Sequence, residues 1–211
     1  MNTATYLALG DSYTIGEGVA AGESWPAQLA RRLRALGVEL ADPQIVAATG
    51  WTTDELSAAM DAATLAPPYA LVSLLIGVNN QYRGRALAEY RDEFAALLAR
   101  ARALAGSPAR VFVVSIPDWG VTRFARAQGR DAARVAGEID AFNAAARTIA
   151  SGASVPFVDV TSISREAGDG DAMLVADGLH PSAAQYALWA EEIVPVARAV
   201  LGHPAQSPPR G

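Results

Sequence analysis

The fold is indicated first by the stretch Ala4-Thr5-Tyr6-Leu7-Ala8-Leu9-Gly10-Asp11-Ser12-Tyr13. It begins with a mostly apolar run, which is typical of a strand buried inside a sheet. A glycine, an aspartate and a serine follow at once, and these residue types favour a turn. The stretch therefore predicts a buried strand over residues 5–9, followed by a turn that carries Ser12.

Four further apolar runs alternate with segments of helical periodicity. The expected strands span residues 5–9, 44–48, 71–76, 111–116 and 156–160. Alternating strands and helices predict a parallel sheet with helices on both faces, joined by right-handed crossovers. We expect an α/β protein, a three-layer α/β/α sandwich with a five-stranded parallel sheet in the flavodoxin-like order 2-1-3-4-5.

The helical segments carry apolar stripes and capping signals. Thr52-Thr53-Asp54-Glu55 is a capping box that opens one helix, and Ser182 caps the last one. Another helix is expected over about residues 131–150. Side chains expected to face the core are Trp25, Leu29, Leu33 and Leu36, which precede a C-cap at Gly37, then Leu87, Tyr90, Phe94, Leu97, Leu98, Ile139, Phe142, Ile149, Tyr186, Trp189, Ile193 and Val196.

The length of 211 residues suits one compact domain. We expect that domain over residues 1–201 and a flexible tail over 202–211. No stretch approaches the roughly 20 apolar residues of a membrane span, and the start carries no signal-peptide pattern, so we expect a cytoplasmic protein.

Composition excludes several classes of function. The chain has no cysteine, and all 17 of its basic residues are arginine, which excludes thiol nucleophiles, Cys-ligated metals and lysine Schiff bases. The net charge is −5 and no basic stripe occurs, so nucleic acid is not expected as a partner. We expect no metal and no other cofactor, and nothing in the sequence indicates the oligomeric state.

Polar residues follow the end of each expected strand. Ser12, Gly50 and Asn79 follow the first three strands, Asp118 follows the fourth, and Asp177 and His180 lie in the loop after the fifth. Because the carboxyl ends of parallel strands meet at one edge of the sheet, we expect these residues to share a crevice.

These residue types suit nucleophilic catalysis by serine. A serine hydroxyl needs a base within hydrogen-bond reach. The chain has two histidines, and His203 lies in the expected tail, which leaves His180 as the candidate base for Ser12. Asp177 can orient its ring. The N–H groups of Ser12 and Gly50 and the side-chain amide of Asn79 can stabilise an oxyanion.

Simpler roles remain open for each residue taken alone. Ser12 could cap a helix, His180 could be an ordinary loop residue before Pro181, and Gly50 and Asn79 could serve turns. A second hypothesis is a flavodoxin-like phosphate- or FMN-binding module, in which Ser12 and its neighbours cradle a phosphate. Such a module has no use for an aspartate and histidine pair.

Other side chains near the strand ends have two interpretations. Arg83 could bind an anionic substrate or remain solvated, and Asp11 could brace the Ser12 loop or pair with Asp118. Four aromatic residues could wall a pocket or pack beneath loops, namely Tyr13, Trp51, Tyr82 and Trp119.

Four short motifs occur in this order along the chain: Gly10-Asp11-Ser12-Tyr13, Gly50, Gly77-Val78-Asn79-Asn80 and Asp177-Gly178-Leu179-His180-Pro181. Together they resemble the four sequence blocks of the SGNH/GDSL hydrolase family. Tyr13 departs from the family's leucine, and Asn80 stands where many members have aspartate. The resemblance implies the SGNH hydrolase fold, with Ser12 as nucleophile, His180 as base, Asp177 as its partner, and Gly50 and Asn79 as oxyanion donors.

The sequence therefore predicts a cofactor-free serine esterase or acylhydrolase of the GDSL type. Its expected substrate is a small-molecule carboxylic ester with a small or medium acyl group, which is cleaved through an acyl-enzyme intermediate.

Overall fold

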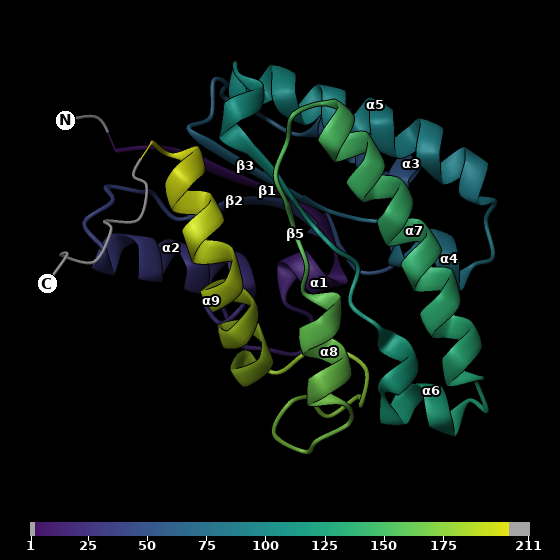
Figure 1. Ribbon diagram of the computed structural model, residues 1–211. Coiled ribbons are helices and arrows are strands. Elements are labelled where there is room, and N and C mark those ends of the chain that lie inside the picture. Colours follow the sequence, from purple (N-terminus) through teal and green to yellow (C-terminus); the bar gives the residue numbers. More distant parts are fainter. Residues whose placement is uncertain (1–2, 203–211) are drawn as a thin grey trace, which may run out of the picture.

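A parallel sheet of five strands forms the middle layer of the computed structural model, which describes residues 3–202 (Figure 1). The strand order is β2-β1-β3-β4-β5, so the predicted order is confirmed. Every residue of β1 is buried, as its apolar run predicts. The strands are β1 (Tyr6–Asp11), β2 (Gln44–Ala48), β3 (Leu71–Leu75), β4 (Val111–Val114) and β5 (Phe157–Val158).

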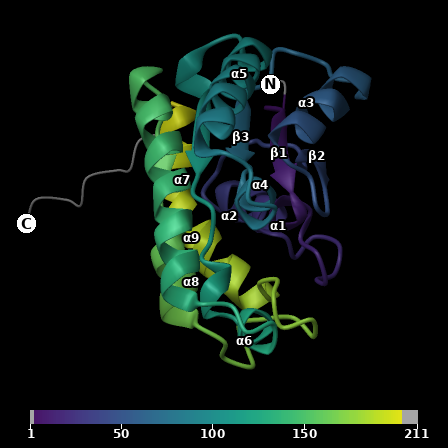
Figure 2. The ribbon, with the colours of Figure 1, turned by 90° about the vertical axis from the view of Figure 1, so that its right-hand side faces the viewer.

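Long helices cover both faces of the sheet and complete the expected sandwich. One layer contains α2 (Trp25–Ala35) and α9 (Ala183–Val200), and the other contains α3 (Thr53–Ala62), α5 (Leu87–Ala105) and α7 (Ala132–Gly152). Figure 2 shows α5 and α7 in front of α2 and α9. No helix within residues 3–202 combines the length and apolar character needed to cross a membrane.

Shorter helical elements lie between the strands and the long helices. The short α-helices are α1 (Ser12–Ile15), α4 (Val78–Tyr82), α6 (Arg123–Ala127) and α8 (Thr161–Ala167), and the 3-10 turns are η1 (Pro108–Arg110) and η2 (Trp119–Val121). Because α1, α4, η2 and α8 each follow the carboxyl end of a strand, they bring distant parts of the chain to one edge of the sheet.

Capping signals place the helix ends. The Thr52 side chain and the Glu55 carboxylate form the predicted capping box of α3. Ser182 accepts a hydrogen bond from the N–H of Gln185 at the start of α9, as expected. The Asp131 carboxylate caps α7 in the same way.

Three of the predicted strands are shorter than expected, and the third ends one residue early, at Leu75. The fourth ends at Val114 rather than at residue 116, because the Asn143 side chain from α7 occupies both backbone groups of Ile116. Its Oδ1 accepts from the Ile116 N–H at 2.8 Å, and its Nδ2 donates to the Ile116 carbonyl at 3.0 Å. The fifth comprises only Phe157–Val158, because the N–H of Val160 bonds to a side chain, the Ser115 hydroxyl.

The expected core is largely confirmed. The largest fully buried side chains include Trp25, Trp189 and Tyr90. The prediction that Leu36 faces the core is wrong, because Leu36 is the C-cap that follows α2 and its side chain is half exposed. Leu87, Ile149 and Val196 are only partly buried against the core. Of the predicted tail, residues 203–211 lie outside the described residues.

Candidate active site

The turn after β1 presents Ser12 at the first position of α1. A glycine is required at position 10, because a Cβ there would lie 2.1 Å from Thr14 Oγ1 and 2.5 Å from the Leu75 carbonyl oxygen. Asp11 is the N-cap of α1, and its Oδ1 accepts from the Tyr13 N–H at 3.0 Å. Asp11 therefore braces the Ser12 loop, which was one of its two predicted roles.

The Asp11 carboxyl is fully buried. Burial raises its pKa to about 7, against the opposing effect of hydrogen bonds from the N–H groups of Tyr13 and of Asp11 itself. The second carboxyl oxygen, Oδ2, has no hydrogen-bond partner among the described residues. A neutral carboxyl suits that environment better than a charged one.

Ser12, His180 and Asp177 form a continuous hydrogen-bonded chain. The distance from Ser12 Oγ to His180 Nε2 is 3.0 Å, and that from His180 Nδ1 to Asp177 Oδ2 is 2.6 Å. A carboxylate accepts hydrogen bonds only, so the proton belongs on Nδ1 and leaves Nε2 free to accept from the serine. The fold brings together residues that are 168 positions apart in sequence.

Asp177 is held in the orientation that it presents to the ring. Its Oδ1 accepts from the N–H groups of Leu179 at 2.8 Å and His180 at 3.0 Å, in a tight local turn. Partial burial raises the pKa of Asp177, but the hydrogen bonds from the ring and from the two N–H groups together outweigh burial and keep the pKa below its ordinary value. Asp177 is thus ionised at neutral pH.

Three side chains tie the loop after β2 to the loop after β3. Asn79 Nδ2 donates to the Trp51 carbonyl at 2.9 Å, and Arg83 Nη2 donates to the Gly50 carbonyl at 2.7 Å. Asn80 accepts from the Thr53 N–H and donates to its hydroxyl. An amide nitrogen has two hydrogens, so Asn79 keeps one for another acceptor. Gly50 has φ +85°, a conformation that favours glycine.

A cavity of about 170 Å³ brings most of the predicted site residues together. Ser12, Gly50, Asn79 and His180 line it, and Asp177 stands behind the histidine ring. Of the four aromatic candidates, Tyr13, Tyr82 and Trp119 line the cavity. Trp51 is absent from the lining and packs against the core instead.

Sequence reasoning missed four residues of the lining: Thr49, Val78, Phe124 and Leu179. Three of them neighbour a predicted site residue in sequence, and that proximity was an available signal. Phe124 lies in the short helix α6, which has too few residues to carry a periodic pattern. Its approach to the cavity depends on tertiary packing.

The remaining alternatives also have structural outcomes. Arg83 is engaged with the Gly50 carbonyl and with Glu55, so it braces a loop. Asp118 does not pair with Asp11, because its Oδ2 lies 2.8 Å from Arg165 Nε. No cluster of three or more His, Asp or Glu side chains within residues 3–202 could hold a metal ion.

A phosphate- or FMN-binding module is not favoured. The start of α1, where such a module would place its phosphate, is capped by the Asp11 carboxyl group. The aspartate and histidine that a phosphate binder does not need are hydrogen-bonded to each other and to Ser12.

Solved structures share this fold over nearly the whole chain. The crystal structure of TesA has a TM-score of 0.74 at 23% identity and covers 93% of this chain and 99% of its own. The lipase/acylhydrolase from Enterococcus faecalis has a TM-score of 0.73 at 21% identity, with coverages of 97% and 100%. The psychrotrophic esterase EstA from Pseudoalteromonas sp. has a TM-score of 0.72 at 16% identity, with coverages of 94% and 98%.

At these identities the structures establish the fold alone, and no curated protein matches the chain by sequence. The family model is more specific, because it matches residues 8–188, a segment that includes Ser12, Gly50, Asn79, Asp177 and His180. The match confirms the resemblance that the four motifs suggested, and this chain belongs to the GDSL-like Lipase/Acylhydrolase family.

Proposed function

We propose that this GDSL-family hydrolase cleaves carboxylic esters of small or medium acyl groups through an acyl-enzyme formed on Ser12. The observation that supports the proposal best is the hydrogen-bonded chain from Ser12 Oγ through His180 to Asp177, with distances of 3.0 and 2.6 Å. This is the arrangement that activates a serine hydroxyl and then stabilises the protonated imidazole.

In the first half of the proposed reaction, Ser12 Oγ attacks the ester carbonyl carbon while His180 Nε2 takes the hydroxyl proton. The carbonyl oxygen becomes an oxyanion, which accepts hydrogen bonds from the Ser12 and Gly50 N–H groups and from the second amide hydrogen of Asn79. The intermediate then collapses, and the bond to the alcohol oxygen breaks. His180 gives its proton to the departing alcohol, and the acyl group stays on Ser12.

In the second half, a water molecule attacks the acyl carbon and gives a proton to His180 Nε2. The new oxyanion uses the same three donors. Its collapse breaks the bond to Ser12 Oγ, which regains a proton from His180, and the carboxylic acid is released. Asp177 holds the proton on Nδ1 throughout and stabilises the imidazolium that forms twice in each turnover.

The cavity supports the assignment of a small or medium acyl group. Its 170 Å³ lies below the roughly 300–1,000 Å³ of sites for drug-sized ligands. Apolar and aromatic side chains form much of its wall, among them Val78, Phe124 and Leu179. An acetyl or butyryl chain fits this description better than a long fatty acyl chain.

The test measures hydrolysis of 4-nitrophenyl acetate, butyrate and octanoate by the wild type and by Ser12→Ala. The matched control is Ser151→Ala, which removes an exposed hydroxyl near the end of α7. We expect hydrolysis that depends on Ser12 and not on Ser151, with octanoate the poorest substrate. Turnover at the wild-type rate by folded Ser12→Ala would disprove the assignment.

A fluorophosphonate probe tests the nucleophile independently of the choice of ester. We expect the wild type to be labelled on Ser12, identified by peptide mass spectrometry, and His180→Ala to be labelled far more slowly. Equal labelling of the two proteins would show that His180 does not activate the serine.

A further inference from the structure

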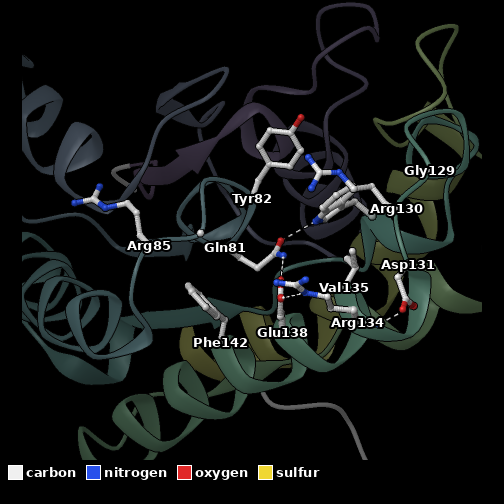
Figure 3. A pocket seen from close by; sticks show the side chains of 12 residues that line it. Gln81, Tyr82, Arg85, Gly129, Arg130, Asp131, Arg134, Val135, Glu138 and Phe142 are labelled. Carbon is white, nitrogen blue, oxygen red and sulfur yellow. Dashed lines mark hydrogen bonds and ion pairs between the residues drawn. The ribbon is translucent and has the colours of Figure 1, made fainter.

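A second cavity, of about 640 Å³, lies beside the catalytic cavity. Figure 3 shows the side chains that line the second cavity. The two cavities share Tyr82 and Trp119, whose rings pack edge to face with centroids 5.3 Å apart. The larger cavity lies between α4 and the start of α7 and is lined by several charged side chains. We call this larger cavity the outer cleft.

Most charged groups of the outer cleft are already paired. Arg85 contacts Asp54, Glu89 and Glu93 outside the cleft. Within the cleft, Arg134 Nε lies 2.8 Å from Glu138 Oε1. The Asp131 carboxylate accepts hydrogen bonds from backbone N–H groups at the start of α7.

Glu138 has a second hydrogen bond, which reaches the wall between the two cavities. Its Oε2 accepts from Gln81 Nε2 at 2.7 Å, and Gln81 Oε1 accepts from Trp119 Nε1 at 2.8 Å. Figure 3 shows the Arg134, Glu138 and Gln81 part of this chain. The two acidic groups of the cleft are thus engaged, and the Trp119 ring is fixed in place.

Arg130 differs from these groups. Its guanidinium carbon lies 5.2 Å from the Tyr82 ring centroid and 5.8 Å from the Trp119 ring centroid. Within residues 3–202 its side chain makes no hydrogen bond and no ion pair, although it lies in a cleft that contains carboxylates. Contact with aromatic rings uses the face of a guanidinium and leaves the N–H donors in its plane for an anion.

We infer that the outer cleft binds an anionic group on the alcohol part of the ester substrate, with Arg130 as its main contact. The inference rests on the proposed function. The catalytic cavity is small and largely apolar, which suits the acyl chain, so the alcohol part extends into the open, charged cleft. The planar guanidinium matches the oxygen geometry of a carboxylate or a phosphate.

Binding of product-like alcohols tests the cleft without any turnover. The probes are 4-hydroxybenzoate, 4-hydroxyphenyl phosphate and the neutral 4-hydroxybenzamide, titrated into the wild type, Arg130→Gln and Arg110→Gln by calorimetry. Arg110→Gln makes the same charge change at an exposed residue before β4, at the opposite edge of the sheet. Binding is measured at low ionic strength, because an exposed ion pair is screened by salt.

We expect the wild type and Arg110→Gln to bind at least one anionic probe more tightly than the amide. Arg130→Gln should weaken anion binding about fivefold and leave amide binding unchanged. The stronger of the two anionic probes identifies the group as a carboxylate or a phosphate. The inference is wrong if the wild type binds the anions no more tightly than the amide, or if Arg130→Gln behaves as Arg110→Gln does.

A kinetic measurement separates this inference from the proposed function. The substrates are 4-acetoxybenzoate, 4-acetoxyphenyl phosphate and 4-acetoxybenzamide, which share one acyl group. Arg130→Gln should lower kcat/KM for an anionic ester about fivefold and leave the amide-substituted ester unchanged. If Ser12→Ala hydrolyses these esters as fast as the wild type, the esterase mechanism alone is refuted. If the ratio of kcat/KM between anionic and neutral esters is the same in Arg130→Gln as in the wild type, the anion site alone is refuted.

Discussion

Replacing Asp11 by asparagine should change how the stability of the protein depends on pH. The Asp11 carboxyl is fully buried and its pKa is raised to about 7 from an ordinary 3.8. Between these two pH values the folded protein holds a proton that the unfolded chain has released. The free energy of unfolding therefore falls as pH rises through this window.

The structure sets the size of the effect. Each pH unit between the two pKa values corresponds to about 1.4 kcal/mol, so the whole window is worth about 4 kcal/mol. Asparagine is neutral at every pH and caps helices as well as aspartate does. Asp11→Asn should therefore lack this contribution while it keeps a cap at the start of α1.

The assay is urea unfolding followed by tryptophan fluorescence at pH 5, 6, 7 and 8. Relative to Asp11→Asn, the wild type should lose about 3 kcal/mol between pH 5 and pH 8, with most of the loss below pH 7. Carboxyls whose pKa is lowered, such as Asp177, titrate in both proteins, so their contribution cancels in the difference. Asp92→Asn, which changes an exposed carboxylate on α5, should follow the wild type.

Parallel stability curves for the wild type and Asp11→Asn over this range would refute the reasoning. They would show that Asp11 is ionised in the folded protein at pH 5, and hence that burial does not control its titration.

Three further predictions concern the site and the strand end beside it. Asn79→Ala should lower kcat for 4-nitrophenyl acetate by about 10²–10³, and a variant with unchanged kcat would remove Asn79 from the proposed oxyanion donors. Asp177→Asn should lower kcat by about 10³–10⁴ through loss of the favoured tautomer, while circular dichroism stays that of the wild type; a loss below tenfold would contradict the role of Asp177 in holding the proton on His180 Nδ1. Gly77→Ala should lower the free energy of unfolding by about 1–3 kcal/mol, because Gly77 has φ +128° and a Cβ there would meet Tyr90 Cε2 at 2.5 Å; urea unfolding identical to the wild type would contradict this.

The sheet could be predicted from the sequence because each strand is a short apolar run between helical segments. The ends of the strands could not be predicted, because side chains that are far away in sequence determine where the strands stop. Asn143 lies on α7 and hydrogen-bonds both backbone groups of Ile116, which ends the pairing of β4 early. Leu36 continues the stripe of α2 in sequence, but the helix stops at Ala35 and the stripe no longer faces the sheet.

The polar half of the site was more predictable than its apolar half. Ser12 and Asn79 each lie just after a strand, and parallel topology brings these strand ends together. His180 lies in the segment between α8 and α9, and its Nε2 approaches Ser12 Oγ to 3.0 Å. Phe124 reaches the same cavity from α6 through packing that no local pattern reveals. Trp51 has a place in sequence like that of Trp119, yet it packs against the core and does not line the cavity.

The two sides of the catalytic cavity are built differently, because hydrogen bonds join the loop after β2 to the loop after β3 on one side only. Asn79, Asn80 and Arg83 hold the Gly50 side as one unit attached to the sheet. The opposite wall comes from separate short segments, among them α6 with Phe124. We expect substitutions of Phe124 to reshape the space offered to a substrate without removing any hydrogen bond of the groups that we propose to carry out bond cleavage. Such a fold can therefore exchange one substrate for another by changes in α6 and its neighbours, while the reaction itself stays the same.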